Sequence, residues 1–352
     1  MMREGPVGMN VTDWTWGPAQ RSCSAAIVGA TGATGVELAE ILLAFGQPAD
    51  RILCFARAES TLRVRDTNLR VQPMPADPRA LAAYDVVFLC TPTEVSLELV
   101  PQLLEHGARI VDLSSAYREA PDVPLIVPEI NGDLLRAGPR LVANPNCTTA
   151  IACLPLAVIA RLVGLEEVVV ASYQAASGAG AAGLDALRCE TREAAGIARG
   201  PGRPSPFPAP IALNVIPAIS TVGEDGVSGE ERKIANEARK ILRLDTLVVE
   251  STTVRVPVER CHSVAVHLRT RTPVDPAAVM AALRSAPGVV WTADPHGPRP
   301  RECAGRDEVF VGRVRAGARG PNSLAFFAVG DQLRKGASLN AVQIAAGLLG
   351  SR

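Results

Sequence analysis

The chain has 352 residues, which is long enough for two domains. Hydrophobic residues make up 47% of it and charged residues 20%, a composition that predicts a buried core and excludes a disordered chain. Its 36 Lys and Arg residues balance its 36 Asp and Glu residues. A chain without net charge has no overall field to hold nucleic acid or an anionic membrane, so we expect neither partner, and any bound anion needs a local site.

The segment before the first predicted strand, residues 1–22, is rich in Trp, Gly and polar residues and lacks the apolar run of a signal peptide. We expect it to form a loose N-terminal extension. The longest uncharged apolar stretch is too short to span a bilayer. The 8 cysteines form no CxxC pair and lie scattered in apolar segments, which indicates reduced thiols of a cytoplasmic protein and predicts neither a disulfide framework nor a metal site.

The first part of the chain alternates short apolar strands with helices. Strands are predicted at 25–28, 51–55, 85–90 and 108–113, and helices at 36–45 and 95–105. The run at 85–90 is apolar after its first residue, as in a strand that is buried on both faces. Right-handed crossovers between such units predict a parallel sheet.

After residue 147 the pattern changes. Runs rich in β-branched residues, at 166–172, 246–258 and 262–270, have fewer helices between them. They predict a second sheet of mixed or antiparallel strands. A Pro/Gly-rich loop is expected at 200–208, and a last helix at 338–349.

A glycine-rich turn, GATGATG at 29–35, joins the first strand to the first helix. Glycines let the backbone approach a pyrophosphate, which the N–H groups at a helix start can bind. The spacing GxxGxxG is less common than GxGxxG, and an ordinary tight turn is the alternative. The candidate dinucleotide-binding residues here are Gly29, Thr31, Gly32, Ala33, Thr34 and Gly35.

The residues after the second strand bear on which dinucleotide binds. NAD-binding proteins commonly place an acidic residue here, against the ribose hydroxyls. This chain has Arg57 first, followed by Ser60 and Thr61. A cation with hydroxyls suits a 2′-phosphate, which predicts NADP. Glu59 complicates this interpretation, and an ordinary surface arginine is the alternative.

Cys147 lies at the predicted start of a helix, in the motif NPNCTT at 144–149. The positive end of a helix dipole lowers the pKa of a thiol, so the position predicts a nucleophilic thiolate. A small core residue is the alternative, and we assign it to the other cysteines. Pro155 predicts a kink or a break in this helix. His262 follows a cation-rich turn and is a candidate acid/base, while His267 is expected to face the opposite side of its strand.

With these motifs, the sequence resembles the aspartate-semialdehyde dehydrogenase family over about residues 25–350. The resemblance implies an α/β fold, with a Rossmann-type parallel-sheet nucleotide-binding domain and an α+β catalytic and dimerisation domain that has a mixed sheet. We expect the first at 23–147, completed by 331–352, and the second at 148–330. Besides the glycine turn and NPNCTT, the matching segments are DLSSAYR (112–118), VPEIN (127–131), SYQAASGAG (172–180), NVIPAI (214–219), GEERKIANEARKIL (229–242), TTVRVPVERCHSVAV (252–266) and GDQLRKGASLNAVQIA (330–345).

The resemblance also implies a role for each matching residue. Cys147 matches the nucleophile, Gln174 the residue that positions the acyl group, and His262 the acid/base. Arg255 matches the contact to the substrate carboxylate and Glu230 the contact to its amine. The residues that match phosphate binding are Arg118, Asn146 and Lys233, and those that join the cofactor site are Ser177, Gly178 and Gln332.

The implied reaction is the NADPH-dependent reduction of 4-phospho-L-aspartate to L-aspartate 4-semialdehyde and phosphate, through a cysteine thioester, in lysine, threonine and methionine biosynthesis. The implied assembly is a homodimer or a homotetramer. Two alternatives stay open: a related reductase of N-acetyl-γ-glutamyl phosphate, whose family reads NPGCY where this chain reads NPNCTT, and a non-catalytic NADPH-binding protein. Leu113, the N-terminal extension and the Pro-rich segment depart from the family pattern and leave a shifted substrate open.

Overall fold

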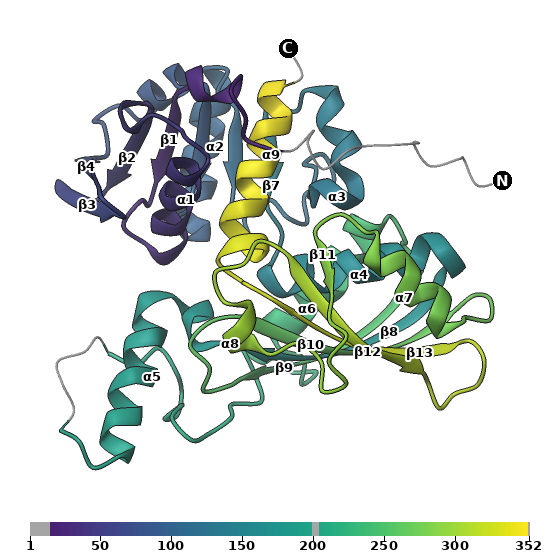
Figure 1. Cartoon of the computed structure of the whole chain (residues 1–352). Coiled ribbons are helices and arrows are strands. Elements are labelled where there is room, and N and C mark those ends of the chain that lie inside the picture. The colour runs from purple at the N-terminus through teal and green to yellow at the C-terminus, as the bar shows by residue number, and fades with distance from the viewer. Residues whose placement is uncertain (1–14, 199–203, 351–352) are drawn as a thin grey trace.

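The computed structural model describes residues 15–198 and 204–350 and contains two sheets, one above the other in Figure 1. The first sheet has the order β3-β4-β2-β1-β5-β6-β7, and its neighbouring strands are parallel except for the pair β3–β4. The parallel sheet predicted from the strand–helix alternation is therefore confirmed. Its strands are β1 Ala25–Val28, β2 Ile52–Ala56, β3 Ser60–Val64, β4 Thr67–Pro73, β5 Val86–Leu89, β6 Ile110–Asp112 and β7 Leu141–Ala143.

Helices cover both faces of the first sheet because its central strands are apolar on both sides, and β1 and β5 are buried at every residue. The helices of this half are α1 Ala33–Ala44, α2 Thr93–Glu105, α3 Pro128–Asn131 and α9 Leu339–Gly350. Helix α9 is the end of the chain, yet it packs beside α1, the first helix (Figure 1). The last segment of the chain thus completes the core of the first half.

The end of the N-terminal extension is not loose, contrary to our expectation. Trp16 is only 1% exposed and its indole Nε1 donates to Gln47 Oε1 at 2.9 Å. Gln20 is also buried, and its side chain donates to the Ala346 carbonyl of α9. A large aromatic ring that finds both an apolar pocket and a hydrogen-bond acceptor is stabilised against the core, a pairing that the sequence does not reveal. The rest of the extension lies outside the described residues.

The second sheet has the order β11-β12-β13-β10-β8-β9 and mixes parallel with antiparallel pairs, as predicted. Its strands are β8 Leu165–Gln174, β9 Val248–Arg255, β10 His262–Thr270, β11 Val289–Trp291, β12 Val309–Ala316 and β13 Ser323–Gly330. The helices of this half are α4 Cys147–Val163, α5 Gly180–Ala194, α6 Gly229–Leu242, α7 Pro276–Arg284 and α8 Pro300–Cys303. Short 3₁₀ segments lie at Gln20–Ser22, Ala49–Arg51, Pro78–Ala83, Gly132–Ala137 and Ala176–Ala179, and a π-helical turn at Arg334–Ser338.

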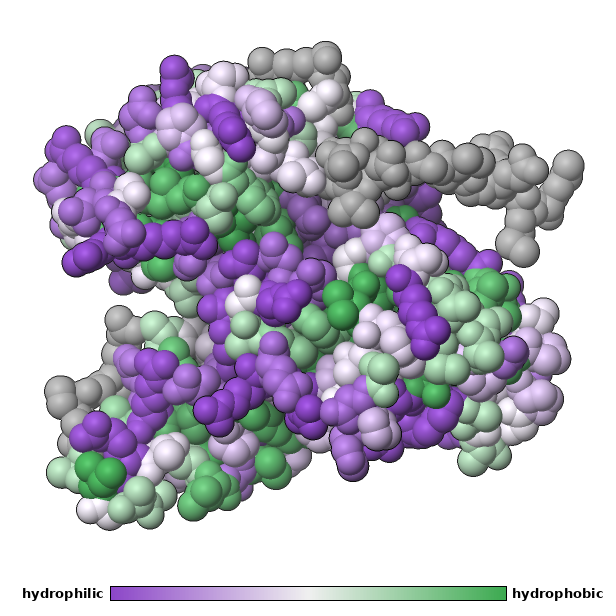
Figure 2. All heavy atoms as spheres, in the orientation of Figure 1, coloured by the Kyte–Doolittle hydropathy of each residue, from purple (hydrophilic) through white to green (hydrophobic). Residues whose placement is uncertain are grey.

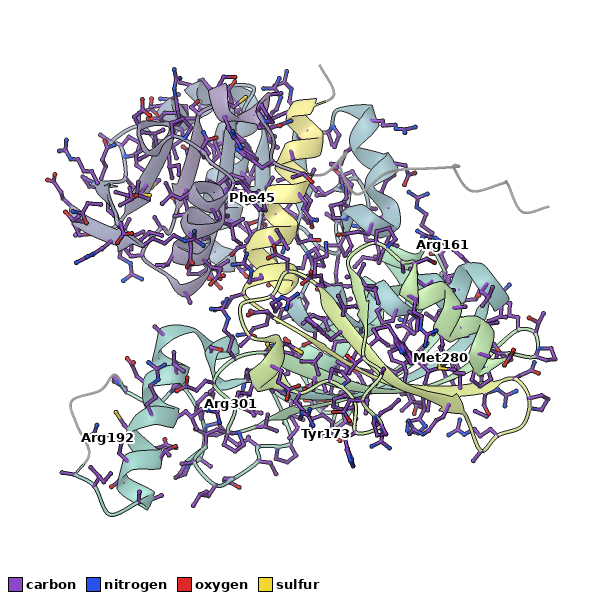
Figure 3. All side chains as sticks on the ribbon, viewed as in Figure 1. Phe45, Arg161, Tyr173, Arg192, Met280 and Arg301 are labelled. Atoms are coloured by element: carbon purple, nitrogen blue, oxygen red, sulfur yellow. The ribbon has the colours of Figure 1, made fainter. Side chains whose placement is uncertain are left out.

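Helices α4, α6 and α7 lie on one face of the second sheet, and no long helix of the described residues covers the other face, which we call the open face (Figure 1). Tyr173 projects from the open face, away from Met280 of α7 (Figure 3), and is 41% exposed. Of the kink or break predicted at Pro155, the break is wrong, because α4 runs unbroken through this residue. Packing of the buried helix against its neighbours outweighs the loss of one backbone hydrogen bond. Among the described residues, no helix has the length and apolarity to cross a membrane.

Candidate active site

Several of the predicted site residues lie at the ends of strands of the two sheets. Cys147 follows β7, at the carboxyl edge of the parallel sheet. From the second sheet, Gln174 ends β8 and pairs in register with Arg255, which ends β9, while His262 begins the antiparallel β10. Figure 2 shows the surface hollowed on one side between the lobe that contains β2–β4 and the one that contains α5. The carboxyl ends of parallel strands are where α/β folds bind ligands.

Cys147 is the first residue of α4, as predicted, and Asn146 is its N-cap. The Asn146 Oδ1 accepts from the backbone N–H groups of Thr148, at 2.9 Å, and Thr149, at 3.2 Å. On the opposite side, Gly336 presses close to Cys147: a Cβ built on Gly336 would lie 2.9 Å from the cysteine Cβ. The glycine of the π-helical turn therefore leaves the room that the Cys147 side chain occupies.

Glu230, in the first turn of α6, connects several of the predicted residues. Its Oε1 accepts from Asn146 Nδ2 at 2.7 Å and from Gln174 Nε2 at 3.4 Å. Its Oε2 lies 3.6 Å from Lys233 Nζ, one turn along the same helix. Glu230 is 7% exposed, so its charge acts in a poorly solvated site, where electrostatic effects are strong.

Arg118 is held beside Asn146 by a buried carboxylate that the sequence analysis missed. The Arg118 Nη1 donates to Glu237 Oε1 at 3.2 Å, and its Nε and Nη2 donate to backbone carbonyls. The other oxygen of Glu237 accepts from the Asn146 backbone N–H at 2.6 Å. Glu237 lies two turns after Glu230 on α6, so helical spacing from Glu230 and Lys233 is the signal that could have found it.

Burial, reinforced by the Glu230 carboxylate, raises the pKa of the Cys147 thiol to about 11, although Arg118 and Arg255 lower it. The sequence analysis expected the helix start to lower this pKa, and the net shift in the chain by itself has the opposite direction. The physical reason is desolvation, which disfavours the charged form of an acid. Formation of the thiolate needs a change in the field around the sulfur.

His262 is fully buried and its hydrogen bonds define its tautomer. The Ala175 backbone N–H donates to Nδ1 at 3.1 Å, so Nδ1 carries no proton and the neutral ring holds its proton on Nε2. Burial and the nearby Arg255 lower the pKa of His262 well below its usual value. Within the described residues Nε2 has no hydrogen-bond partner. A Cβ on Gly178 would lie 3.1 Å from this nitrogen, so the glycine keeps space open beside a proton donor. His267 is exposed, on the opposite side of the strand, as predicted.

The glycine turn between β1 and α1 is shaped as a dinucleotide site requires. Gly29 has φ +84°, and a Cβ there would lie 2.3 Å from the Cys90 carbonyl oxygen. A Cβ on Gly35 would lie 2.4 Å from the Gly29 oxygen. Helix α1 has Gly32 as its N-cap, without a side chain to bind the first N–H groups. The turn of residues 29–35 therefore presents backbone donors and a positive dipole end to an anion.

The other predicted cofactor residues lie in two places. Arg57 and Ser60 are exposed at the end of β2 and start of β3, and Thr61 is next to them. The carboxylate of Glu59, which complicated the NADP prediction, pairs with Arg70 at 2.8 Å.

Ser177 and Gln332 lie near His262. Gln332 Nε2 donates to Ser177 Oγ at 2.6 Å, and Gln332 Oε1 accepts from the Cys261 backbone N–H at 2.8 Å. Both side chains thus link the C-terminal segment to the start of β10.

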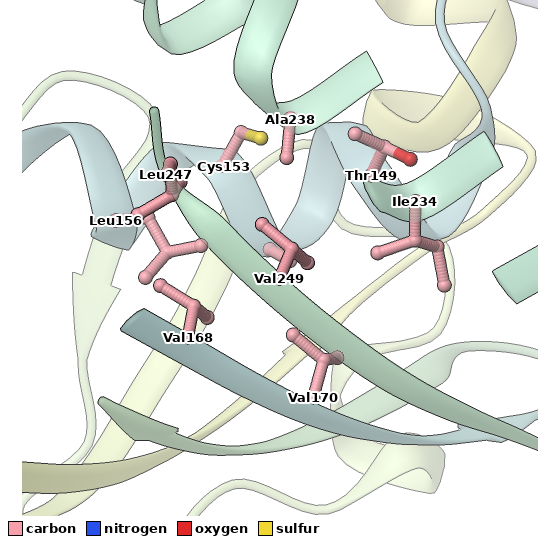
Figure 4. A pocket seen from close by; sticks show the side chains of 10 residues that line it. Thr149, Cys153, Leu156, Val168, Val170, Ile234, Ala238, Leu247 and Val249 are labelled. Carbon is pink, nitrogen blue, oxygen red and sulfur yellow. The ribbon is translucent and has the colours of Figure 1, made fainter. Parts of the chain in front are cut away.

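A small apolar cavity lies between α4, α6 and the second sheet (Figure 4). Cys153 lines it and is fully buried, with a pKa raised by burial. Its lining is apolar apart from Thr149, so it is a packing void of the core. This supports the interpretation of Cys153 as a core residue.

Comparison with known proteins matches both halves of the chain. The family model "Semialdehyde dehydrogenase, NAD binding domain" matches residues 24–137, and "Semialdehyde dehydrogenase, dimerisation domain" matches residues 155–335. The aspartate-semialdehyde dehydrogenases of Synechocystis sp. and Streptomyces akiyoshiensis are each 37% identical over 91% of this chain, and over 95% and 96% of their own lengths. The crystal structure of aspartate semialdehyde dehydrogenase II complexed with ASA from Vibrio cholerae is 35% identical with a TM-score of 0.85, covering 93% of this chain and 98% of that one.

Proposed function

The chain belongs to the aspartate-semialdehyde dehydrogenase family, and from this membership and the geometry around Cys147 we propose that it reduces 4-phospho-L-aspartate to L-aspartate 4-semialdehyde and phosphate with NADPH. The product is an intermediate for lysine, threonine and methionine. The observation that carries the proposal is the convergence on one cysteine of a carboxylate, Glu230, and a buried arginine, Arg255.

The pair Glu230 and Arg255 fits the free end of an aspartyl group. The amine and the α-carboxylate of such a substrate lie close to the reacting carbon, so the site needs an anion and a cation near the nucleophile. Both residues act electrostatically on Cys147, with opposite sign. Arg255 suits a carboxylate because its planar guanidinium can donate two parallel hydrogen bonds.

Arg118, Asn146 and Lys233 fit the phosphate side of the substrate. Glu237 neutralises part of the Arg118 charge and orients its guanidinium, so we propose Glu237 as a positioning residue. Lys233 is about one-third exposed and loosely paired at 3.6 Å, which leaves its ammonium able to turn toward an incoming phosphate. These cations also stabilise the leaving phosphate by charge-assisted hydrogen bonds.

The chemistry begins when the Cys147 sulfur attacks the acyl carbon and the C–O bond to phosphate breaks, giving a thioester. An ammonium group bound at Glu230 cancels the negative field that adds to burial in raising the pKa of the Cys147 thiol, so substrate binding shifts the thiol toward the thiolate. Gln174 donates to Glu230 at 3.4 Å, and from this position it would contact the acyl group of the bound substrate.

His262 offers its Nε2–H to the carbonyl oxygen, where negative charge develops. We therefore refine its proposed acid/base role: the ring holds and donates a proton at Nε2, while Nδ1 stays bound to Ala175.

The glycine turn fits NADP, and Gly29, Gly35 and the α1 amides are the groups that would hold its pyrophosphate. When bound, NADPH supplies the hydride that reduces the thioester. Arg57 follows β2, and Ser60 and Thr61 begin β3. A residue that binds the 2′-phosphate of NADP is expected at this end of β2, so these three residues would bind it. Gln332 and Ser177 link the C-terminal segment to the strand start that carries His262, and with Gly178 they would border the nicotinamide of a bound NADP.

We propose a division into an NADP-binding domain, 23–147 with 331–352, and a catalytic and dimerisation domain, 148–330. The open face of the second sheet carries Tyr173, whose ring lies 6.4 Å from that of Phe327. An aromatic, uncovered sheet face supports a homodimer. A reducing compartment, the cytoplasm, suits a chain whose 8 cysteines form no CxxC pair and lie scattered in apolar segments.

The deciding assay follows NADPH oxidation with enzymatically made 4-phospho-L-aspartate. In the reverse direction, aspartate semialdehyde and its N-acetyl form are compared in the presence of NADP and phosphate. We expect rejection of the N-acetyl compound, because acylation removes the cation that pairs with the buried Glu230. Equal kcat/KM for the two compounds would favour the N-acetyl-γ-glutamyl-phosphate reductase alternative. A chain that binds NADPH but reduces neither acyl phosphate would be the non-catalytic alternative.

A further inference from the structure

Arg255 differs from the other buried arginine of the site in the kind of partner it has. Arg118 forms an ion pair with Glu237 at 3.2 Å. Arg255 is only 6% exposed, yet within residues 15–198 and 204–350 no carboxylate lies at ion-pair distance from it. Its Nη1 donates to the Ala175 carbonyl at 2.7 Å, and burial lowers its pKa. Glu230 acts on Arg255 only from beyond ion-pair distance, so the desolvated guanidinium needs a further stabilising contact.

That stabilisation comes from an aromatic ring in the Pro-rich segment. The Arg255 Cζ lies over the ring of Phe207, 5.8 Å from its centroid, within the range of a cation–π interaction. The ring packs against the small apolar cluster of Ala176, Leu187, Ile211 and Ile216. The position of the ring is also limited by Gly183 of α5, where an added Cβ would lie 3.0 Å from Phe207 Cζ.

The segment that carries Phe207 is anchored to the strand of Arg255 and to α5. Ile216 and Arg255 exchange backbone hydrogen bonds of 2.9 and 2.8 Å. Residues 211 and 212, which follow Phe207 in the chain, are bound to Glu190 of α5. The Glu190 Oε2 accepts from the backbone N–H groups of Ile211, at 2.6 Å, and Ala212, at 3.1 Å. The ring is therefore fixed relative to the guanidinium, although it comes from a loop.

We propose that Phe207 is a positioning residue for substrate binding, which orients the Arg255 guanidinium without neutralising it; this rests on the proposed role of Arg255 as the carboxylate contact. A carboxylate partner would fix the guanidinium equally well but would compete with the α-carboxylate of the substrate. An aromatic face stabilises the cation and leaves its donors and its net charge to the ligand. The Pro-rich segment thereby becomes part of substrate recognition.

The test is steady-state kinetics of aspartate semialdehyde oxidation, with NADP and phosphate saturating. Phe207→Leu keeps the apolar bulk and removes the aromatic face. Replacement of Phe207 by 3,5-difluorophenylalanine keeps the ring, weakens its negative face and leaves Cζ free toward Gly183; Tyr is unsuitable because its hydroxyl would be added there. The matched control is Trp291→Leu, which removes the cation–π contact of Arg284, 5.5 Å from the ring centroid, at the edge strand β11.

We expect Phe207→Leu to raise KM for aspartate semialdehyde by about 5- to 30-fold, the range for a partly to fully desolvated cation–π contact, with kcat and KM for NADP near the parent values. The difluoro variant is expected to raise KM in the same direction, by a smaller factor, and Trp291→Leu to leave it unchanged. If KM is unchanged in both Phe207 variants, or rises in the leucine variant alone, the ring face has no electrostatic role and the proposal is wrong. A parent enzyme that does not oxidise aspartate semialdehyde would overturn the proposed function itself.

Discussion

Replacing Glu230 by Gln is predicted to move two measurable properties of the enzyme in opposite directions. The amide has the size of the carboxylate and retains an oxygen that can accept from Asn146 Nδ2, now 2.7 Å from Glu230 Oε1. What disappears is the negative charge. This charge favours substrate binding, because it pairs with the ammonium group of the substrate. The same charge disfavours the nucleophilic thiolate, because it raises the pKa of the Cys147 thiol.

The loss to turnover follows from one charge-assisted hydrogen bond, about 1.5–3 kcal/mol, so kcat/KM for aspartate semialdehyde is expected to fall about 10- to 150-fold. In the enzyme without substrate, the same substitution increases the reactivity of the Cys147 thiol. With a pKa of about 11, roughly one Cys147 in a thousand is a thiolate at pH 8, and that fraction rises about tenfold with each pH unit. Removal of the Glu230 charge lowers this pKa, so alkylation at pH 8 becomes faster.

The assay measures iodoacetamide labelling between pH 7 and 10, with peptide mass mapping to confirm that Cys147 is the labelled residue. Glu231→Gln is the matched control, because its carboxylate lies in the same helical turn but accepts from the backbone N–H groups of Ser228, at 2.7 Å, and Thr253, at 3.0 Å. Partial unfolding would expose Cys153 and label it as well. Slower or unchanged alkylation of Cys147 in Glu230→Gln would falsify the electrostatic reasoning.

The remaining predictions concern single roles. Cys147→Ala is expected to abolish turnover without unfolding, as measured by circular dichroism; preferential labelling of Cys153 or Cys261 in the parent would contradict the assignment. Arg57→Ala is expected to weaken NADPH binding by about 1.5–3 kcal/mol more than NADH binding; equal kcat/KM for both cofactors in the parent would count against it. Arg255→Lys retains the charge and loses the bidentate fork, so catalysis is expected to fall while NADPH affinity, measured by fluorescence titration, stays unchanged. Sedimentation is expected to show a dimer at least, and a species of the single-chain mass, 36.9 kDa, at micromolar concentration would refute it.

The sequence identifies the elements whose cause is local. The apolar runs between helices predict the parallel sheet, because a strand buried on both faces must be apolar throughout. The spacing at 29–35 predicts the glycine turn, because only glycine tolerates the close approach found at Gly29 and Gly35. NPNCTT predicts that Cys147 starts a helix, because Asn146 is a favourable N-cap. The resemblance to the family, carried by these motifs, is confirmed by the comparisons.

The tertiary structure decides what depends on residues far apart in the chain. Whether Cys147 is a thiol or a thiolate depends on burial and on Glu230, and these outweigh the local effect of the helix start. The tautomer of His262 depends on the Ala175 N–H, which β8 brings to β10. The burial of Trp16 depends on its hydrogen bond to Gln47 and on its packing against the hydrophobic core around the first sheet.

Glu237 and Phe207 gain their proposed roles from contacts with Arg118 and Arg255, residues that lie far from them in the sequence. Sequence motifs predict features that neighbouring residues determine, such as a glycine turn or the N-cap of a helix. Charge states and orientations are set by desolvation and by fields that act across space, so the fold has to bring the groups together before these properties exist.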